Sequence, residues 1–520
     1  MFAVSQEQQR MGLESWALIQ LKLNVVHRIT ATTMRWIRKL VVNLPELFVV
    51  TSTLLASIAA GGMKGMPSVL MEVFKRNDSL IQFDLDTESW IASVHGFAGI
   101  ASIFIPNLMQ CWDRRFGFRC SCLSVLIGWI VLCFANSSIT IIVAEVFQGA
   151  GVKSLLVVCM VTISEMVDPK IRNQSIVSYG MIQTFVVLFV HTSGNFIHWK
   201  TISLIMCVTL TFAIIFSFIW PESPAWLAYK GRFEESKKSF IWLRGKNKES
   251  LVELNALFKA QREFLQSQTS SQTSKRGKSL MRPIWQKISG QDFYIPIFHM
   301  FVLISSYYWS GNLFIVVYAI HVVHKVIENS KSAFIAMILM DVAFVVGNVS
   351  CPILLKYFDN KTILLTGGAF SILFLLCSST VLYLQEIDIV ANDSLLCLYS
   401  LVGFMVCSSA AFFIVPFDVA TEIIPLRHRG VAGSLYIVFI SVSYTTTLKI
   451  APYVINIVGT HGIFLLYAFI LSFCLTWIWK YIPETKNKTL QNIEEHFIKR
   501  SKDVIIEGEI NEINSLNNIY

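Results

Sequence analysis

Long apolar segments separated by short polar stretches dominate the sequence. A helix needs about 20 consecutive apolar residues to cross the hydrocarbon layer of a bilayer. Segments of this kind lie near residues 46–63, 89–109, 119–135, 139–163, 174–193, 201–220, 294–320, 332–355, 362–384, 394–420, 431–455 and 461–482. The pattern predicts an all-α membrane protein with twelve transmembrane helices, arranged as six plus six.

The longest polar stretch inside the chain, residues 221–291, separates the two sets of six. It carries fourteen Lys or Arg against six Asp or Glu. Lys and Arg near the ends of membrane spans favour the cytoplasmic side, so we expect this stretch and both termini to be cytoplasmic. The predicted organisation is a cytoplasmic tail, a six-helix bundle, a cytoplasmic linker with helices, a second six-helix bundle and a second tail, at residues 1–45, 46–220, 221–291, 292–482 and 483–520.

The loops on the opposite side are acidic or neutral, as the same orientation requires. Asn77 and Asn392 each begin an Asn-Asp-Ser sequon in these outer loops. Both are therefore candidate glycosylation sites.

Composition supports a membrane protein and excludes other classes. The chain is 54% hydrophobic and 15% charged, whereas soluble domains carry about 25% charged residues. The net charge is +9, and the basic residues lie in the segments between apolar spans. In that position they would set the orientation in the membrane, which argues against nucleic-acid binding. We expect no enzymatic activity, cofactor or metal site, because His191, His299 and His321 have no acid or nucleophile at a useful spacing and no Gly-rich phosphate loop precedes a helix.

Two sequence elements occur once in each half of the chain. Glu165 and Arg172 are separated by six residues after the fourth apolar segment, and Glu422 and Arg429 have the same spacing after the tenth. PESPAWL follows the sixth segment and PETKNKTL follows the twelfth, which places Glu222 and Glu484 at related positions. Internal repeats of this kind are typical of transporters built from two similar halves.

The repeated charges lie where helices leave the membrane on the predicted cytoplasmic side. Arg forms planar, bidentate pairs with carboxylates and stays charged at physiological pH. The pairs Glu165 with Arg172 and Glu422 with Arg429 could therefore hold the inner ends of two bundles together and act as a gate. Ordinary solvated interfacial charges are the alternative.

These motifs resemble those of the major facilitator sugar porters. PESPAWL is similar to their segment after helix 6, and PETKNKTLQNIEE to their segment after helix 12. The stretches GGMKGMPSVL and DTESWIAS resemble helix 1 and the helix 2 entry of the insect trehalose transporter group. The resemblance implies two six-helix bundles, a sugar site near the membrane midplane, and alternating access by rocking of the bundles.

Some family positions differ in this chain. The loop between helices 2 and 3 has one extra residue and a Phe in place of a basic residue, and its gating candidates are Asp113, Arg114 and Arg119. Helix 4 carries Glu145 where the family typically has an Arg. A buried charge reversal requires a partner. Lys153 lies two helical turns away on a similar face, a separation too long for a direct pair along one helix.

Five ionisable residues fall within or near apolar segments. They are Glu145, Lys153, Asp341, Asp418 and Lys449. Such residues avoid lipid, so we expect most of them to face the bundle interior. Structural pairing and a role in substrate or proton transport both remain open for this set.

The resemblance also locates a candidate sugar site, because the family uses amides and aromatics on helices 5, 7, 10 and 11. At or near the matching positions the chain has Gln183, Tyr307, Tyr308, Trp309, Ser310, Asn312, Asn348 and Phe417. Hydroxyls and amides match sugar hydroxyls, and aromatic rings cover the sugar's C–H face. Gly311 would permit a helix break beside them.

The sequence therefore predicts a cell-membrane carrier of a small sugar, trehalose or a hexose. The resemblance implies a facilitative mechanism by alternating access. A nutrient sensor that does not transport, a proton-coupled carrier and an organic-ion carrier are the alternatives. Its expected partners are the sugar and the lipid bilayer, and its oligomeric state is left open.

Overall fold

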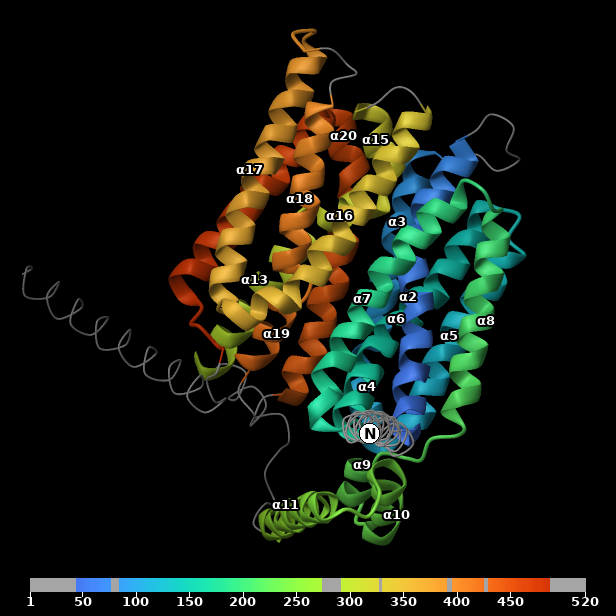
Figure 1. Ribbon diagram of the computed structural model, residues 1–520, viewed down its shortest axis with the longest axis vertical. Helices are drawn as coiled ribbons and strands as arrows, with labels where there is room; N and C mark the ends of the chain where they lie inside the picture. The colour runs from blue at the N-terminus through green and yellow to red at the C-terminus, as the bar shows by residue number, and fades with distance from the viewer. Residues whose placement is uncertain are drawn as a thin grey trace, which may run out of the picture.

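The computed structural model describes residues 44–75, 84–273, 291–326, 330–390, 395–424 and 429–486, and every regular element in these ranges is a helix (Figure 1). Ten of the described helices are long and apolar enough to cross a membrane. The glycosylation candidates Asn77 and Asn392 lie outside the described residues, as do most of the two predicted tails.

The helices of the N-terminal half lie on the right of Figure 1. They are α2 (Leu44–Lys75), α3 (Leu85–Gly99), the 3₁₀ helix η1 (Ile100–Phe104), α4 (Ile105–Cys111), α5 (Arg114–Cys133), α6 (Ser138–Met166), α7 (Pro169–Gly194) and α8 (Trp199–Ser217). They pack around one apolar core, in which Trp129 and Phe118 are fully buried. Below, the N-terminal half means these elements.

The helices of the C-terminal half lie on the left of Figure 1. They are α13 (Gln291–Tyr308), α14 (Asn312–Val317), α15 (Ala319–Val326), α16 (Ser330–Tyr357), α17 (Asn360–Glu386), α18 (Leu396–Phe412), α19 (Val415–Glu422) and α20 (Arg429–Tyr481). They pack mainly around a second core. The backbone of α20 turns at Gly459, whose φ of 83° is non-helical, so this element contains two consecutive helices.

Three of the apolar segments form interrupted helices. The 89–109 segment continues from α3 through η1 into α4, and the 394–420 segment breaks between α18 and α19, where Pro416 lies in the first turn of α19. The 294–320 segment breaks at Gly311, whose φ of 93° is left-handed, and this confirms the helix break expected there. A Cβ at Gly311 would lie 3.0 Å from the Tyr467 ring, so both backbone and space favour glycine.

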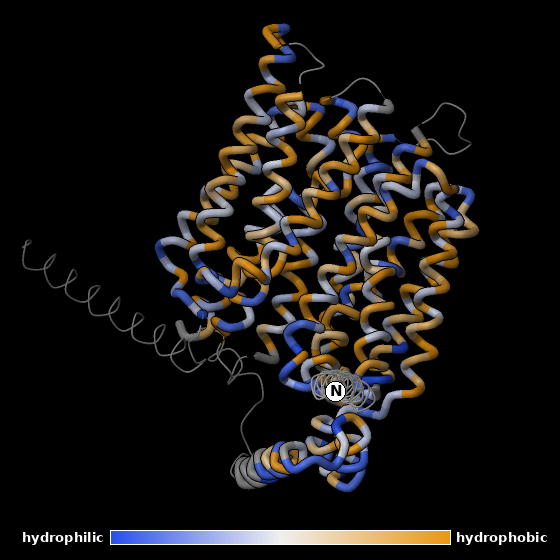
Figure 2. The backbone as a smooth tube through the Cα atoms, in the orientation of Figure 1, coloured by the Kyte–Doolittle hydropathy of each residue, from blue (hydrophilic) through white to orange (hydrophobic). Residues whose placement is uncertain are grey.

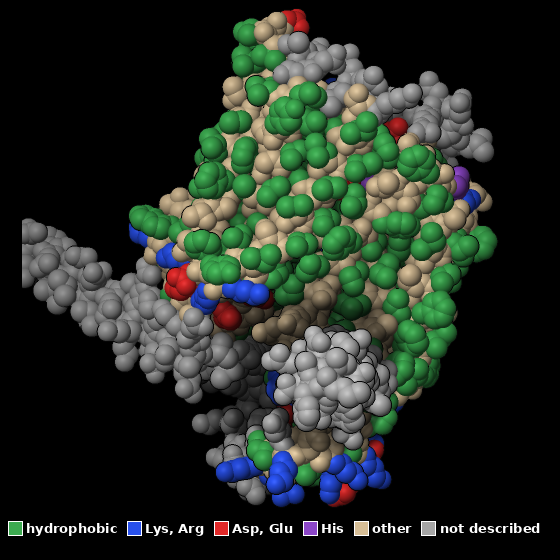
Figure 3. All heavy atoms as spheres, in the orientation of Figure 1, with side chains coloured by type: hydrophobic (Ala, Val, Ile, Leu, Met, Phe, Trp, Pro, Cys, Tyr) green, Lys and Arg blue, Asp and Glu red, His purple; other side chains and the backbone are tan. Residues whose placement is uncertain are grey.

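The outer surface of the helices is apolar along most of their length (Figures 2 and 3). Large side chains such as Phe134, Phe196 and Phe469 are about three-quarters exposed, at 77%, 74% and 75%. A soluble protein rarely exposes such an extensive apolar surface. Contact with lipid accounts for it, and the basic side chains gather at the lower end in Figure 3.

Three further helices lie below the N-terminal half in Figure 1: α9 (Pro224–Tyr229), α10 (Phe233–Arg244) and α11 (Lys248–Thr273). Arg244, at the end of α10, connects them to the half above. Its Nη2 donates to the Val167 carbonyl at 3.1 Å, and its Nε lies 3.6 Å from the Glu46 carboxylate. The helices expected in the 221–291 stretch are therefore present in its described part.

Candidate transport site and the contacts around it

An aromatic cluster from the C-terminal half lies at the contact between the two halves. Tyr307 and Tyr308 end α13, and their ring centroids are 4.8 Å apart. Tyr307 also lies 5.2 Å from Phe417 and 6.1 Å from Phe413, and Tyr308 lies 6.1 Å from Tyr444. The breaks in the 294–320 and 394–420 segments bring these rings together from α13, α19, α20 and the break between α18 and α19, where Phe413 lies. This set of five rings is called the aromatic cluster below.

The N-terminal half presents two lysines to the aromatic cluster. Lys64 of α2 donates to Gln183 Oε1 of α7 at 2.8 Å, and its Nζ lies 5.5 Å from the centre of the Phe413 ring. Lys153 of α6 is 8% exposed, and its Nζ lies 4.7 Å from the Tyr444 ring. Removing an ammonium from water costs several kcal/mol. A cation–π contact offsets only about 0.5–2 kcal/mol of this cost.

The structure brings only part of the predicted sugar site together. Gln183, Tyr307, Tyr308 and Phe417 meet at the cluster, as described above. Trp309 instead packs against Tyr467, with ring centroids 6.4 Å apart.

The polar residues beside the break at Gly311, between α13 and α14, form hydrogen bonds within the C-terminal half. Ser310 donates to the Tyr307 carbonyl at 2.8 Å and accepts from the Asn312 amide at 3.2 Å. The Asn312 side chain donates to Ser408 Oγ at 2.8 Å. Asn348 of α16 is fully buried, and its amide has no hydrogen-bond partner among the described residues. An unsatisfied buried amide is unusual in folded proteins and marks a position where a ligand or water could bind.

Glu145 is buried against His95 of α3 rather than against Lys153. The Glu145 carboxylate contacts His95 Nε2, and neither side chain is exposed. Gly149 permits this contact, because a Cβ there would lie 2.5 Å from the His95 carbonyl, so α3 and α6 approach closely. The sequence indicated that Glu145 requires a partner but did not identify His95, which is fifty residues away along the chain.

The buried Glu145 contact should contribute to stability. We expect Glu145→Ala to lower the free energy of unfolding by about 2–5 kcal/mol, because it leaves a cavity and a buried imidazole without its partner. Glu145→Gln keeps the shape and a hydrogen-bonding group, so it should cost much less. Thermal unfolding of the detergent-solubilised protein measures both. Equal melting temperatures for Glu145→Ala and the parent chain would contradict this account.

A second buried pair joins the two halves. His191 Nδ1 of α7 lies 2.8 Å from Asp341 Oδ2 of α16, and the two side chains are 0% and 3% exposed. The sequence predicted Asp341 as a buried charge, which the structure confirms. The spacing of residues along the sequence did not indicate this partner of His191, because Asp341 is 150 residues away along the chain and is supplied by the other half.

Two of the predicted buried charges are not buried. Asp418 is exposed in the first turn of α19, where a carboxylate interacts favourably with the helix N-terminus. Lys449 of α20 is 23% exposed. Its Nζ lies 3.1 Å from Asp86 and donates to Ser89 at 2.6 Å, both from α3. The burial predicted for these two residues is therefore not observed, although Lys449 does face the other half.

Further polar contacts join the two halves at α15, which lies at the upper end of the molecule in Figure 1. The Ile320 backbone amide of α15 lies 3.4 Å from Ser68 Oγ of α2. His324, one turn along α15, lies 3.8 Å from the Glu72 carboxylate. Together with the Lys449 contact, these connect α2 and α3 to α15 and α20 where the helices end.

The predicted gating charges form a cluster at the lower end of the N-terminal half. Arg114 donates to both carboxylate oxygens of Glu165, from Nε at 3.1 Å and from Nη2 at 2.9 Å. Ser223 also donates to Glu165, at 2.5 Å. Arg172 donates instead to the Val167 carbonyl at 3.3 Å. The Glu165 partner is therefore Arg114, and the pairing with Arg172 expected from the repeat was wrong.

The repeated Pro-Glu segments have equivalent structural roles in the two halves. Glu222 accepts hydrogen bonds from the backbone amides of Arg114 and Arg115 at 2.8 and 3.2 Å, at the start of α5. Glu484 accepts one from the Lys361 amide at 2.9 Å, at the start of α17. Each carboxylate thus stabilises the N-terminus of the third helix of its half. Burial raises the pKa of Glu222, and hydrogen bonds from backbone amides oppose that shift.

The remaining gating candidates also contact their own half. Arg119 donates to Ser217 Oγ at 3.0 Å and stacks 3.9 Å from the Phe218 ring. Asp113 is the residue that precedes α5. Glu422 ends α19, and the side chain of Arg429 lies outside the described residues, so their pairing stays a prediction. Each described contact of these gating residues joins parts of the same half of the chain. The expected clasp between the two bundles is therefore not seen among the described residues.

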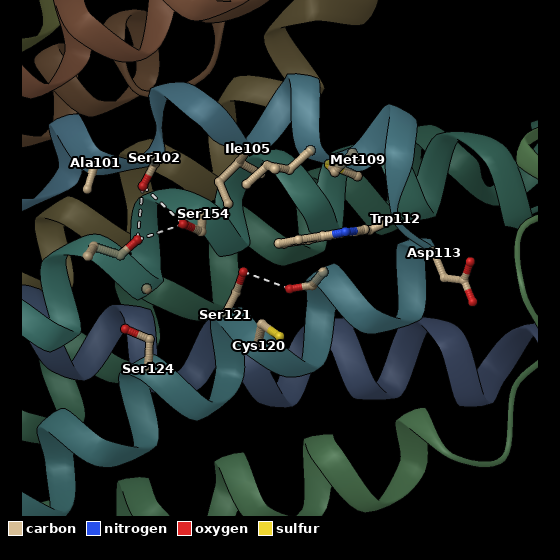
Figure 4. Close-up of a pocket in the computed structure, with 14 residues that line it drawn as sticks. Ala101, Ser102, Ile105, Met109, Trp112, Asp113, Cys120, Ser121, Ser124 and Ser154 are labelled. Atoms are coloured by element: carbon tan, nitrogen blue, oxygen red, sulfur yellow. Dashed lines mark hydrogen bonds between the residues drawn. The ribbon is translucent and has the colours of Figure 1, made fainter.

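A pocket within the N-terminal half is separate from this interface. It is lined mainly by apolar side chains of η1, α4, α5 and α6, with Trp112 and Met109 at one end and Ser102 and Ser154 at the other (Figure 4). Ser102 and Ser154 lie 3.0 Å apart and both donate to the Ala150 carbonyl, so their polar groups are already satisfied. It does not match the predicted sugar site, which lies at the contact between the halves.

The family can now be assigned from comparison with known proteins. Residues 47–497 match the model of the family described as "Sugar (and other) transporter". The chain belongs to this family. It is 24% identical over 474 residues to the facilitated trehalose transporter Tret1 of Apis mellifera ligustica, covering 89% of this chain and 88% of that protein. It is 25% identical over 423 residues to the sugar transporter ERD6-like 2 of Arabidopsis thaliana, covering 79% and 86% of the two chains.

Solved structures support the same fold. The inward-open xylose transporter XylE of E. coli superposes with a TM-score of 0.66 at 14% identity, over 86% of this chain and 99% of that chain. XylE bound to 6-bromo-6-deoxy-D-glucose gives a TM-score of 0.65. Among the sequence relatives, the facilitated trehalose transporter Tret1 of Drosophila mojavensis is a longer protein, and the match covers only 52% of its length.

Proposed function

We propose that this family member carries a sugar across the cell membrane by alternating access between two six-helix bundles. The interrupted segments count as single crossings, and α20 counts as two, which gives twelve crossings. In this proposal the cytoplasmic side is the lower end in Figure 1, where α9 to α11 lie, and both termini are cytoplasmic. The gating candidates then stabilise the inner ends of each bundle.

The placement of the aromatic cluster carries the proposal. Rings from broken helices of one half face Lys64, Gln183 and Lys153 of the other half. A sugar held there would place its C–H face on the rings and its hydroxyls on amides and ammonium groups. Helix breaks near a midplane are a common way to frame a substrate in transporters.

The polar contacts between the halves support an outer side that is closed in this conformation. Ser68, Asp86 and His191 of the N-terminal half each contact the C-terminal half, at Ile320, Lys449 and Asp341. Rocking of the halves about the cluster would have to break these contacts to admit a solute from outside.

Uptake measurements test this function directly. In oocytes that display the chain on their surface, we expect time-dependent, saturable uptake of labelled trehalose or glucose. Tyr307→Ala should reduce the initial rate about tenfold through loss of ring stacking. Tyr399→Ala is the matched control, because Tyr399 is 63% exposed on the outer surface. Absence of uptake for every sugar, with the protein at the surface, would favour a sensor instead.

A further inference from the structure

We propose that the transported sugar bears an anionic group, a carboxylate or a phosphate, which binds Lys153 and Lys64 beside the aromatic cluster. This inference rests on the proposed transport function, since it specifies the solute of the same site. The observations that carry it are the positions of the two ammonium groups and the charges around them.

Lys153 is a nine-tenths buried cation without a counter-charge. It is 8% exposed, and its Nζ faces the rings of Tyr444 at 4.7 Å and Tyr308 at 5.9 Å. None of the ion pairs in the described residues includes Lys153. Ring contacts alone do not replace the hydration of an ammonium group. A buried side chain of this kind, aimed across the contact between the halves, is suited to bind an anion.

Lys64 adds a second positive charge at the same cluster. Its Nζ donates to Gln183 at 2.8 Å and lies 5.5 Å from the Phe413 ring centre. Its described partners are therefore an amide and a ring, and neither carries a negative charge. Ring contacts connect Phe413 through Tyr307 and Tyr308 to Tyr444, so the two lysines lie along one continuous aromatic surface.

The buried acids nearby already have other partners. Glu145 contacts His95, and Asp341 contacts His191. Both acids are thus held by imidazoles, and neither forms an ion pair with Lys64 or Lys153 in the described residues. Among the described residues, therefore, no carboxylate forms an ion pair with Lys64 or Lys153 beside the aromatic cluster.

The arrangement fits a molecule with one apolar face and one charged end. A sugar ring can cover the aromatic rings, while a carboxylate or phosphate receives charge-assisted hydrogen bonds from the ammonium groups. The hydroxyls of a neutral sugar can accept hydrogen bonds from the same groups but supply no counter-charge. Binding of the anionic sugar should therefore be preferred.

Glucose and glucuronate provide a matched comparison, since they differ only at the C6 position. In surface-displayed protein, we expect initial uptake of glucuronate to exceed that of glucose by about tenfold or more at equal concentration. Lys153→Met should abolish that preference, and Lys153→Arg should keep part of it. Glucose 6-phosphate is the third solute in the comparison. Its uptake relative to that of glucuronate distinguishes a site for a phosphate from a site for a carboxylate.

Lys200→Met is the control variant. Lys200 lies at the start of α8, where it donates to Asn136, so its loss removes one positive charge away from the aromatic cluster and should leave the preference intact. Uptake of glucose with no preference for either anionic sugar would overturn the inference and leave the transport function standing. A preference for the anionic sugar that survives Lys153→Met would also overturn it. No uptake of any sugar would reject both proposals.

Discussion

Reversing the charge of either member of the Arg114–Glu165 pair should reduce sugar uptake roughly a hundredfold. Arg114→Glu or Glu165→Arg places like charges in a largely buried contact, and leaving a buried charge unpaired costs about 3 kcal/mol or more. The side chains are 12% and 20% exposed, and two hydrogen bonds join them. The measurement is the initial uptake rate, normalised to the amount of protein at the cell surface.

Combining the two reversals should restore part of the lost uptake. Recovery should be incomplete, because Ser223 also donates to Glu165 and Arg114 also donates to the Met109 carbonyl. The Glu165→Arg and Arg172→Glu combination is the matched control, since it reverses the pairing that the repeat suggested. Recovery in this control, without recovery in the Arg114 combination, would show that the functional partner is Arg172 and would contradict the structure.

The sequence was sufficient to predict most helix positions, because apolar length alone identifies a membrane segment. It also located the break between α13 and α14, since Gly311 is the residue type that a left-handed backbone favours. The two Pro-Glu segments were recognised as equivalent by their repeat. Their role at the starts of α5 and α17 was not, because it depends on backbone amides from distant parts of the chain.

The partners of the buried charges could not be predicted in the same way. Sequence spacing reports neighbours on one helix, whereas His95 reaches Glu145 from a second helix and Asp341 reaches His191 from the other half. The rotation of each helix within the fold decides these contacts. Lys64 was overlooked although a signal existed, since a lysine in the middle of an apolar segment is by default a functional candidate.

Locking the contact between α2 and α15 tests alternating access most directly. Ser68 Oγ lies 3.4 Å from the Ile320 amide nitrogen, so cysteines introduced at these two positions would lie on either side of a close contact between the halves. The parent chain and each single variant are the controls, because the chain contains eleven cysteines of its own. The measurement is sugar uptake by the Ser68→Cys, Ile320→Cys protein before oxidation, after oxidation, and after reduction.

The account predicts that oxidation stops uptake in the double variant and that reduction restores it, while the controls are unaffected. The halves could then no longer separate on the outer side to admit the sugar. Undiminished uptake by protein shown to be fully cross-linked would contradict transport by rocking of the two halves.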